Sequence, residues 1–152
     1  VPELYLELDP YANAYTTGET KAAITITSGL LETIPEYLLP TVLAHECGHI
    51  ACHHVLYTTM GRWILTGAVN ALPLNIAKTA LTPINAAFAY WMRCSEYSAD
   101  RAAILCDGTP DKLFELCMRL AGMDKDIIHR ANLDAFFEQA KEEFVFGNKQ
   151  TR

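Results

Sequence analysis

The chain has 152 residues, of which 51% are hydrophobic and 20% are charged, and its formal net charge is −6. This size predicts one globular domain that is long enough to bury a sizeable core. No cluster of Lys and Arg is present to neutralise phosphates, so the composition excludes a nucleic-acid-binding surface. The five cysteines have no C-x-x-C spacing, and we expect reduced thiols of an intracellular protein.

The chain begins with three predicted strands, at residues 4–8, 13–18 and 22–27. The last of them alternates apolar residues with threonine, which is typical of a half-buried strand. Turn residues separate the strands. We expect a small, mainly antiparallel sheet in which at least one strand, near residues 13–17, lies at the edge.

The next segment is predicted to form the main helix. Residues 28–31 are expected to turn the chain, and a helix begins at residues 34–36 with proline in its first turn. A second proline, Pro40, is expected to bend or restart this helix. The main helix then covers about residues 41–58.

Residues 61–92 are rich in apolar residues, but Asn, Pro and Lys interrupt them at short intervals. A membrane-spanning helix needs about 20 predominantly apolar residues in succession, so a single spanning helix is not expected. Two short amphipathic helices near 62–72 and 74–82, followed by a third from about 84, fit the pattern better. Two interpretations stay open: a helical hairpin packed on the core, or a mobile lid or patch that contacts membrane or another subunit.

The third of these helices continues to about residue 105 and ends at Asp107-Gly108. Further helices are predicted at 109–120 and at about 131–144, and the polar residues 147–152 are expected to form a disordered tail. Because no linker or internal repeat is visible, we expect residues 1–146 to form a single α+β domain in which the sheet packs on the helices.

The most informative motif is His45-Glu46-x-x-His49, within an apolar run that is compatible with a helix. Residues four apart share one helix face, so the two imidazoles can point at one metal ion, and Glu46 can reach a metal-activated water. This arrangement is typical of a zinc protease. The alternatives are a chance pattern on a buried helix, and a site with sulfur ligands from Cys47 or Cys94.

A catalytic zinc site needs a third protein ligand and one open position. Glu96 can supply that ligand from the predicted helix at 84–105, and Asp100 lies one turn later on the same face. Asp100 can accept a hydrogen bond from the ring N–H of a histidine ligand, for which we expect His45. The competing interpretation is that both carboxylates form ion pairs with nearby arginines, Arg93 and Arg101.

The motif at residues 45–49, followed by Ser-Glu-Tyr-Ser-Ala-Asp at 95–100, resembles the gluzincin metallopeptidases, and within them the HtpX and CAAX prenyl protease family. Residues 13–18, Asn-Ala-Tyr-Thr-Thr-Gly, are similar to that family's Asn-Ala-aromatic strand, which lines the substrate cleft. The resemblance implies a zincin-like fold and one Zn2+ per chain. It assigns Glu46 as general base, and as metal ligands His45, His49 and Glu96.

The resemblance also implies a substrate. Asn13 and Ala14, on an edge strand, would pair with an extended or unfolded polypeptide, because main-chain hydrogen bonds bind a strand whatever its side chains. A side chain that stabilises the oxyanion is expected beyond Asp100, and no motif chooses among the candidates His129, Arg130 and Arg119. His53 falls near the ligand stripe of the predicted helix, where we expect a polar helix-end residue and not a fourth ligand.

The chain departs from the integral-membrane members of that family. Some of these carry spanning helices between the metal helix and the glutamate, whereas prolines interrupt this interval here. The chain also starts without an initiator methionine or a signal peptide. We therefore expect a soluble or excised catalytic core that is cytoplasmic, from a parent protein that can be membrane-associated with this domain on the cytoplasmic side.

The leading hypothesis is a zinc-dependent endopeptidase, in which Glu46 takes a proton from a metal-activated water that attacks a peptide carbonyl. One alternative is a zinc-stabilised module without catalysis. The other is a latent enzyme whose cleft is covered by residues 61–92. The sequence assigns no pocket-lining residue, so it predicts neither the substrate nor the cleavage specificity.

Overall fold

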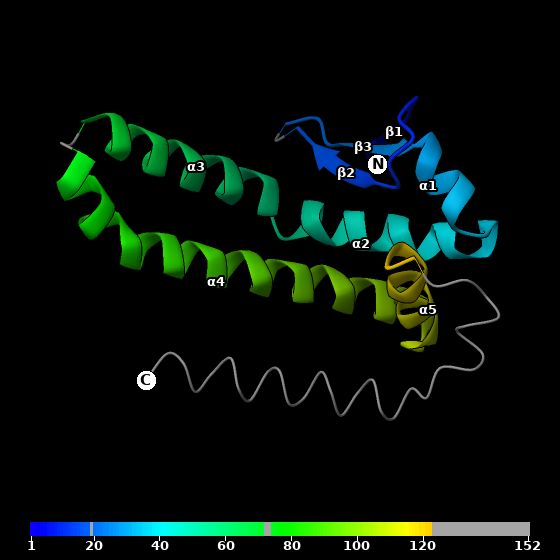
Figure 1. Cartoon of the computed structure of the whole chain (residues 1–152). Helices are drawn as coiled ribbons and strands as arrows, with labels where there is room; N and C mark the ends of the chain where they lie inside the picture. The colour runs from blue at the N-terminus through cyan, green and yellow to red at the C-terminus, as the bar shows by residue number, and fades with distance from the viewer. Residues whose placement is uncertain (19, 72–73, 123–152) are drawn as a thin grey trace.

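The computed structural model describes residues 1–18, 20–71 and 74–122. A small sheet lies over one helix, and two long helices form a hairpin that extends away from the sheet (Figure 1). The strands are β1 (Glu3–Glu7), β2 (Ala14–Thr17) and β3 (Ala23–Thr27). The helices are α1 (Ser28–Thr33), the 3-10 helix η1 (Glu36–Leu38), α2 (Leu39–Ala51), α3 (His54–Ala71), α4 (Leu74–Asp107) and α5 (Asp111–Leu120).

The sheet has the order β1-β3-β2, so β2 is an edge strand, as predicted. β2 runs antiparallel to β3, but β1 runs parallel to it, with Leu4 opposite Ile24. The prediction of a mainly antiparallel sheet is therefore wrong, and the sheet is mixed. The reason is that the chain reverses direction between β1 and β2 and again between β2 and β3. β3 therefore runs in the same direction as β1 when it pairs with it.

β3 leads directly into helix α1, because the side chain of Thr27 caps that helix. Thr27 is buried, and its Oγ1 accepts a hydrogen bond from the backbone N–H of Leu30 at 3.2 Å. The turn predicted at residues 28–31 is therefore wrong. A threonine at the end of a strand satisfies one of the free N–H groups of the following helix.

Helix α2 starts near Pro40, which occupies its first turn and does not bend it. The helix predicted over residues 41–58 is in fact two helices. α2 ends at Ala51, and α3 begins at His54, after His53 with φ 54°. A positive φ at a non-glycine residue is uncommon and marks a break in the helical path. The core beside α2 contains Leu30, Ile34, Leu38, Val42, Leu113 and Leu116.

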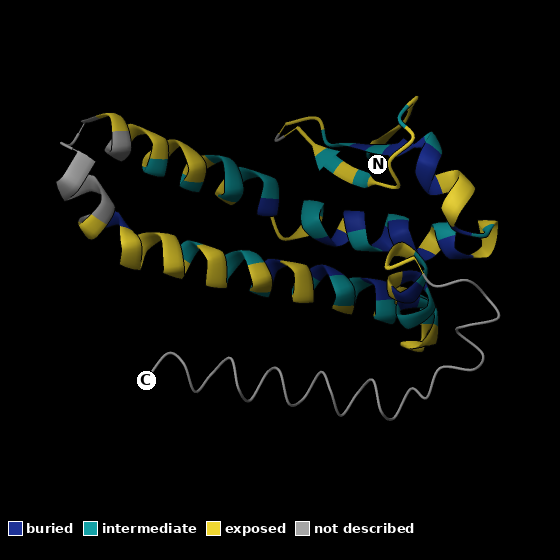
Figure 2. Ribbon diagram, viewed as in Figure 1, coloured by how far each residue is buried: buried dark blue, intermediate teal, exposed yellow. Residues whose placement is uncertain are grey.

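Helices α3 and α4 form the hairpin, and their outer faces are exposed over most of their described length (Figure 2). α4 runs from Leu74 to Asp107 and passes through Pro83, so the short helices predicted on either side of that proline are wrong. The predicted end at Asp107-Gly108 is confirmed, with φ 76° at Gly108. No helix in the described part of the chain is long and apolar enough to cross a membrane. The predicted helix at 131–144 and the predicted tail lie outside the described residues.

Candidate metal centre

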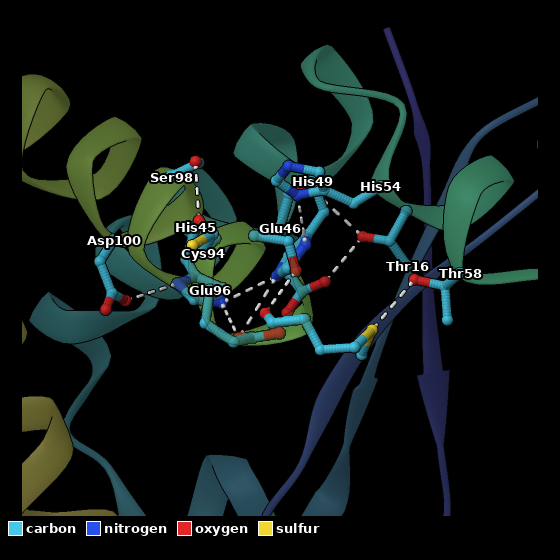
Figure 3. A network of polar contacts seen from close by, with 12 residues as sticks. Thr16, His45, Glu46, His49, His54, Thr58, Cys94, Glu96, Ser98 and Asp100 are labelled. Atoms are coloured by element: carbon cyan, nitrogen blue, oxygen red, sulfur yellow. Dashed lines mark hydrogen bonds and ion pairs between the residues drawn. The ribbon is translucent and has the colours of Figure 1, made fainter. Parts of the chain in front are cut away.

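The centre lies where α2 packs against α4. Gly48 of α2 permits this close approach, since a Cβ placed there would lie 2.9 Å from Ala99 Cα and 2.9 Å from Ala102 Cβ. Small residues at a helix–helix contact let the two backbones come together. The face of α2 that carries His45 and His49 therefore lies beside the turn of α4 that carries Glu96 (Figure 3).

The three predicted ligands form a compact triangle of donor atoms. The Nε2 atoms of His45 and His49 are 3.1 Å apart, and Oε2 of Glu96 lies 3.5 Å from the first and 3.6 Å from the second. A tetrahedral zinc ion with bonds of about 2.0–2.1 Å would separate its ligand atoms by about 3.3 Å. Two imidazole nitrogens and one carboxylate oxygen at these separations fit zinc without rearrangement.

Asp100 lies against the first histidine. Its Oδ1 is 3.0 Å from Nδ1 of His45, the ring nitrogen that faces away from the triangle. Burial by itself lowers the pKa of His45, but the hydrogen bond to Asp100 and the charges of Asp100, Glu46 and Glu96 together raise it above its ordinary value. When Nδ1 donates its hydrogen to Asp100, Nε2 presents a lone pair toward the metal position.

His54 lies against the second histidine, His49, and the sequence did not predict this contact. Its Nδ1 is 2.9 Å from Nδ1 of His49, and the ring is buried. Burial, followed by the neighbouring imidazole of His49, lowers the pKa of His54. The sequence predicted an unbroken helix, on which His53 falls near the face that carries the metal ligands. The break after Ala51 puts His54 beside His49 instead.

Glu46 is buried beside the triangle and is held by the edge strand. The hydroxyl of Thr16 donates to Oε2 of Glu46 at 2.6 Å (Figure 3). A cavity of about 470 Å³ opens at this point, and its lining includes Ala14, Thr16, Thr58, Arg62, Met92 and all of the three predicted ligands. The only sequence signal for Thr16 was its place within the Asn-Ala-aromatic strand.

The edge strand presents main-chain groups to this cavity. The carbonyl of Asn13 accepts a hydrogen bond from the N–H of Thr27 at 3.0 Å, so the main chain of Asn13 is paired within the sheet. Because hydrogen-bonded and non-hydrogen-bonded pairs alternate in an antiparallel ladder, the N–H and C=O groups of Ala14 and Thr16 point away from β3. The free edge is therefore that of Ala14 and Thr16.

The remaining candidates are not part of this cluster of possible metal ligands, or they lie outside the described residues. The cluster of possible metal ligands in the described part of the chain does not include Cys47 or Cys94. Arg93 lies over the ring of Tyr90, and Glu96 and Asp100 make their ion-pair contacts with histidines. Arg119 is bound to Glu115 at 2.7 Å on α5. His129 and Arg130 are outside the described residues.

An α+β domain that places a helix-borne HExxH pair against a glutamate from a second helix has the architecture of a metallopeptidase centre. The comparisons agree with this class. The model of "Peptidase family M48" matches residues 2–138. The chain therefore belongs to peptidase family M48.

The chain is similar to several curated members of that class. It is 35% identical to the plastoglobule-localized metallopeptidase 48 of Arabidopsis thaliana, over 92% of this chain and 41% of that protein. It is 29% identical to a protease HtpX homolog of Ralstonia nicotianae, over 74% of this chain and 47% of that protein. It is also 29% identical to a protease HtpX homolog of Burkholderia thailandensis, over 93% of this chain and 55% of that protein. The chain thus spans about half the length of these relatives. No solved structure matches it.

Proposed function

We propose that this chain is the catalytic domain of a zinc-dependent endopeptidase that hydrolyses peptide bonds in extended or unfolded polypeptides. The observation that carries the proposal is the triangle of His45, His49 and Glu96, whose donor separations of 3.1 to 3.6 Å suit a tetrahedral zinc ion. Zinc bound by these three residues would supply Lewis acidity to a water molecule and to the scissile carbonyl.

Glu46 is the general base in this proposal. One of its carboxylate oxygens accepts the hydrogen bond from Thr16 at 2.6 Å, which fixes the carboxylate and leaves the other oxygen for the attacking water. Glu46 takes a proton from that water as the new C–O bond forms, and it delivers the proton to the leaving amide nitrogen as the C–N bond breaks. The balance is one water consumed, with one carboxyl and one amino group released.

The edge of β2 binds the substrate in this proposal. The free N–H and C=O groups of Ala14 and Thr16 can pair with an extended peptide, which places its backbone along the cavity that contains Glu46. Such pairing uses main-chain groups alone, so it favours unfolded or extended segments over folded proteins. The sequence predicted that Asn13 pairs with the substrate, whereas in this proposal Asn13 anchors β2 through its bond with Thr27.

We also propose that the hairpin contacts a lipid surface or another subunit. Residues 47–95 contain no Asp or Glu and three basic residues, so the chain's net charge of −6 divides into +3 within this segment and −9 outside it. On α3 an exposed apolar stripe follows the helical repeat, with side chains 49 to 76% exposed, and consists of Tyr57, Met60, Trp63 and Ile64.

The test of the proposed function is metal content measured together with cleavage of a generic unfolded protein. We expect one zinc per chain, cleavage that a chelator abolishes, and recovery when zinc is added back. Stoichiometric zinc without cleavage would favour a non-catalytic module. Cleavage that appears only after deletion of residues 64–82 would favour a latent enzyme, because α3 forms one wall of the cavity through Thr58 and Arg62.

A further inference from the structure

We infer that His54 is a positioning residue for the metal centre: its neutral imidazole accepts a hydrogen bond from Nδ1 of His49 and so holds His49 in the tautomer that binds metal. This inference rests on the proposed zinc site. His54 is not a ligand in it, and the arrangement gives each of the two histidine ligands its own acceptor, Asp100 for His45 and His54 for His49.

The positions of the hydrogen atoms follow from the geometry. Nε2 of His49 lies in the donor triangle, 3.1 Å from Nε2 of His45 and 3.6 Å from Oε2 of Glu96, so this nitrogen must carry a lone pair when metal is bound. A neutral imidazole then carries its hydrogen on Nδ1. That N–H faces Nδ1 of His54 at 2.9 Å, which must accept it, so the hydrogen of His54 is on Nε2.

The surroundings of His54 keep its ring in place for this role. His54 is 8% exposed, and its ring packs edge to face on Trp91 of α4, with ring centroids 5.9 Å apart. An imidazolium has no lone pair on Nδ1, so His54 accepts this hydrogen bond only as the neutral ring. The packing on Trp91 therefore holds Nδ1 of His54 at the position where His49 needs an acceptor.

The path of the chain also fits this role. α2 ends at Ala51, and the positive φ of 54° at His53 turns the chain so that His54 starts α3 beside His49. On an unbroken helix His54 would follow His49 by five residues and would point about 140° away from it. The break between the helices thus brings the two rings together, and Trp91 links this contact to the hairpin.

Three variants of the full 152-residue chain test the inference by zinc affinity, measured by competition with a chelator. His54→Phe keeps an aromatic ring against Trp91 but has no acceptor, and we expect zinc affinity to fall by about 10- to 100-fold. His54→Asn places a carbonyl oxygen near the position of Nδ1, and we expect affinity within about threefold of the wild type. His53→Asn is the matched control at an exposed position with positive φ, and we expect no change.

The second readout is the tautomer itself. In the zinc-loaded, 15N-labelled protein, imidazole NMR should report His49 protonated at Nδ1, and His54 protonated at Nε2 alone. Circular dichroism of the zinc-free variants checks that each is folded. Unchanged zinc affinity in folded His54→Phe, or a hydrogen on Nδ1 of His54, would overturn the inference while leaving the proposed function in place. A wild-type chain that binds no zinc would instead overturn the proposed function.

Discussion

Replacing Gly48 with alanine should damage the metal centre, although alanine is the better helix former. The added Cβ would lie 2.9 Å from Ala99 Cα and 2.9 Å from Ala102 Cβ, whereas carbon atoms in contact are normally about 3.5–4.0 Å apart. α2 and α4 must therefore separate locally by roughly 0.6–1 Å. Metal–ligand distances tolerate deviations of only about 0.2 Å, so Glu96 would no longer match the two histidines.

The expected magnitude comes from two opposing terms. Overpacking a tight contact costs about 1–3 kcal/mol, and replacing glycine by alanine in a helix interior gains about 1 kcal/mol. We expect a net loss of up to about 2 kcal/mol in the free energy of unfolding, which corresponds to a fall in Tm of about 2–4 °C per kcal/mol for a chain of this size. Zinc affinity should fall at least about tenfold, as for other displacements of ligand support.

Gly67→Ala is the matched control, because a Cβ at that position in α3 would meet no atom within 4 Å beyond its own helical turn. It should raise Tm slightly through helix propensity and leave zinc affinity unchanged. The assays are thermal unfolding of the metal-free chain and chelator competition for zinc. If Gly48→Ala raised Tm as Gly67→Ala does and kept wild-type zinc affinity, the packing argument for the centre would be refuted.

Three further predictions concern the base, the acid stability and the hairpin. Thr16→Val removes the hydroxyl that is hydrogen-bonded to Glu46, so kcat/KM should fall about 10- to 100-fold while zinc affinity stays unchanged. Thr16→Ser should retain activity. A fall in zinc affinity as large as the fall in kcat/KM would contradict this prediction. The hydroxyl of Thr41 and the ammonium of Lys112 hold the pKa of Asp107 below its ordinary value, so this carboxylate stabilises the fold at neutral pH and that contribution is lost as pH falls through its folded pKa. Asp107→Asn should therefore lower Tm at pH 7 and flatten its acid dependence; an unchanged Tm-versus-pH curve would refute this. Trp63→Glu should reduce co-sedimentation with anionic vesicles severalfold without affecting cleavage, and wild-type binding in that variant would exclude this face of α3.

Much of the centre could be predicted from the sequence because its residues are spaced by helix periodicity. The four-residue separation of His45 and His49 already puts both rings on one face, and the same separation between Glu96 and Asp100 defines the second helix face. The structure brings Asp100 to His45, as that spacing suggested. These contacts need only two regular helices packed side by side.

The parts that could not be predicted depend on tertiary contacts. No glycine or proline lies beside His53 to mark the break between α2 and α3. The positive φ of His53 comes with a tertiary contact, the packing of His54 on Trp91 and His49. The parallel pairing of β1 with β3 joins strands far apart in sequence, which alternation within a strand cannot reveal. Helix α4 continues through Pro83, where a local rule predicts a boundary.

The most direct test of the central claim is the cleavage rate of Glu46→Gln, with zinc content measured in the same sample. Glutamine has nearly the same shape as glutamate and can keep the contact with Thr16, but it cannot take a proton from water. We predict one zinc per chain, as in the wild type, with cleavage of an unfolded protein reduced to the level of the chelated enzyme. Wild-type cleavage by the zinc-loaded variant would contradict the assignment of Glu46 as the general base.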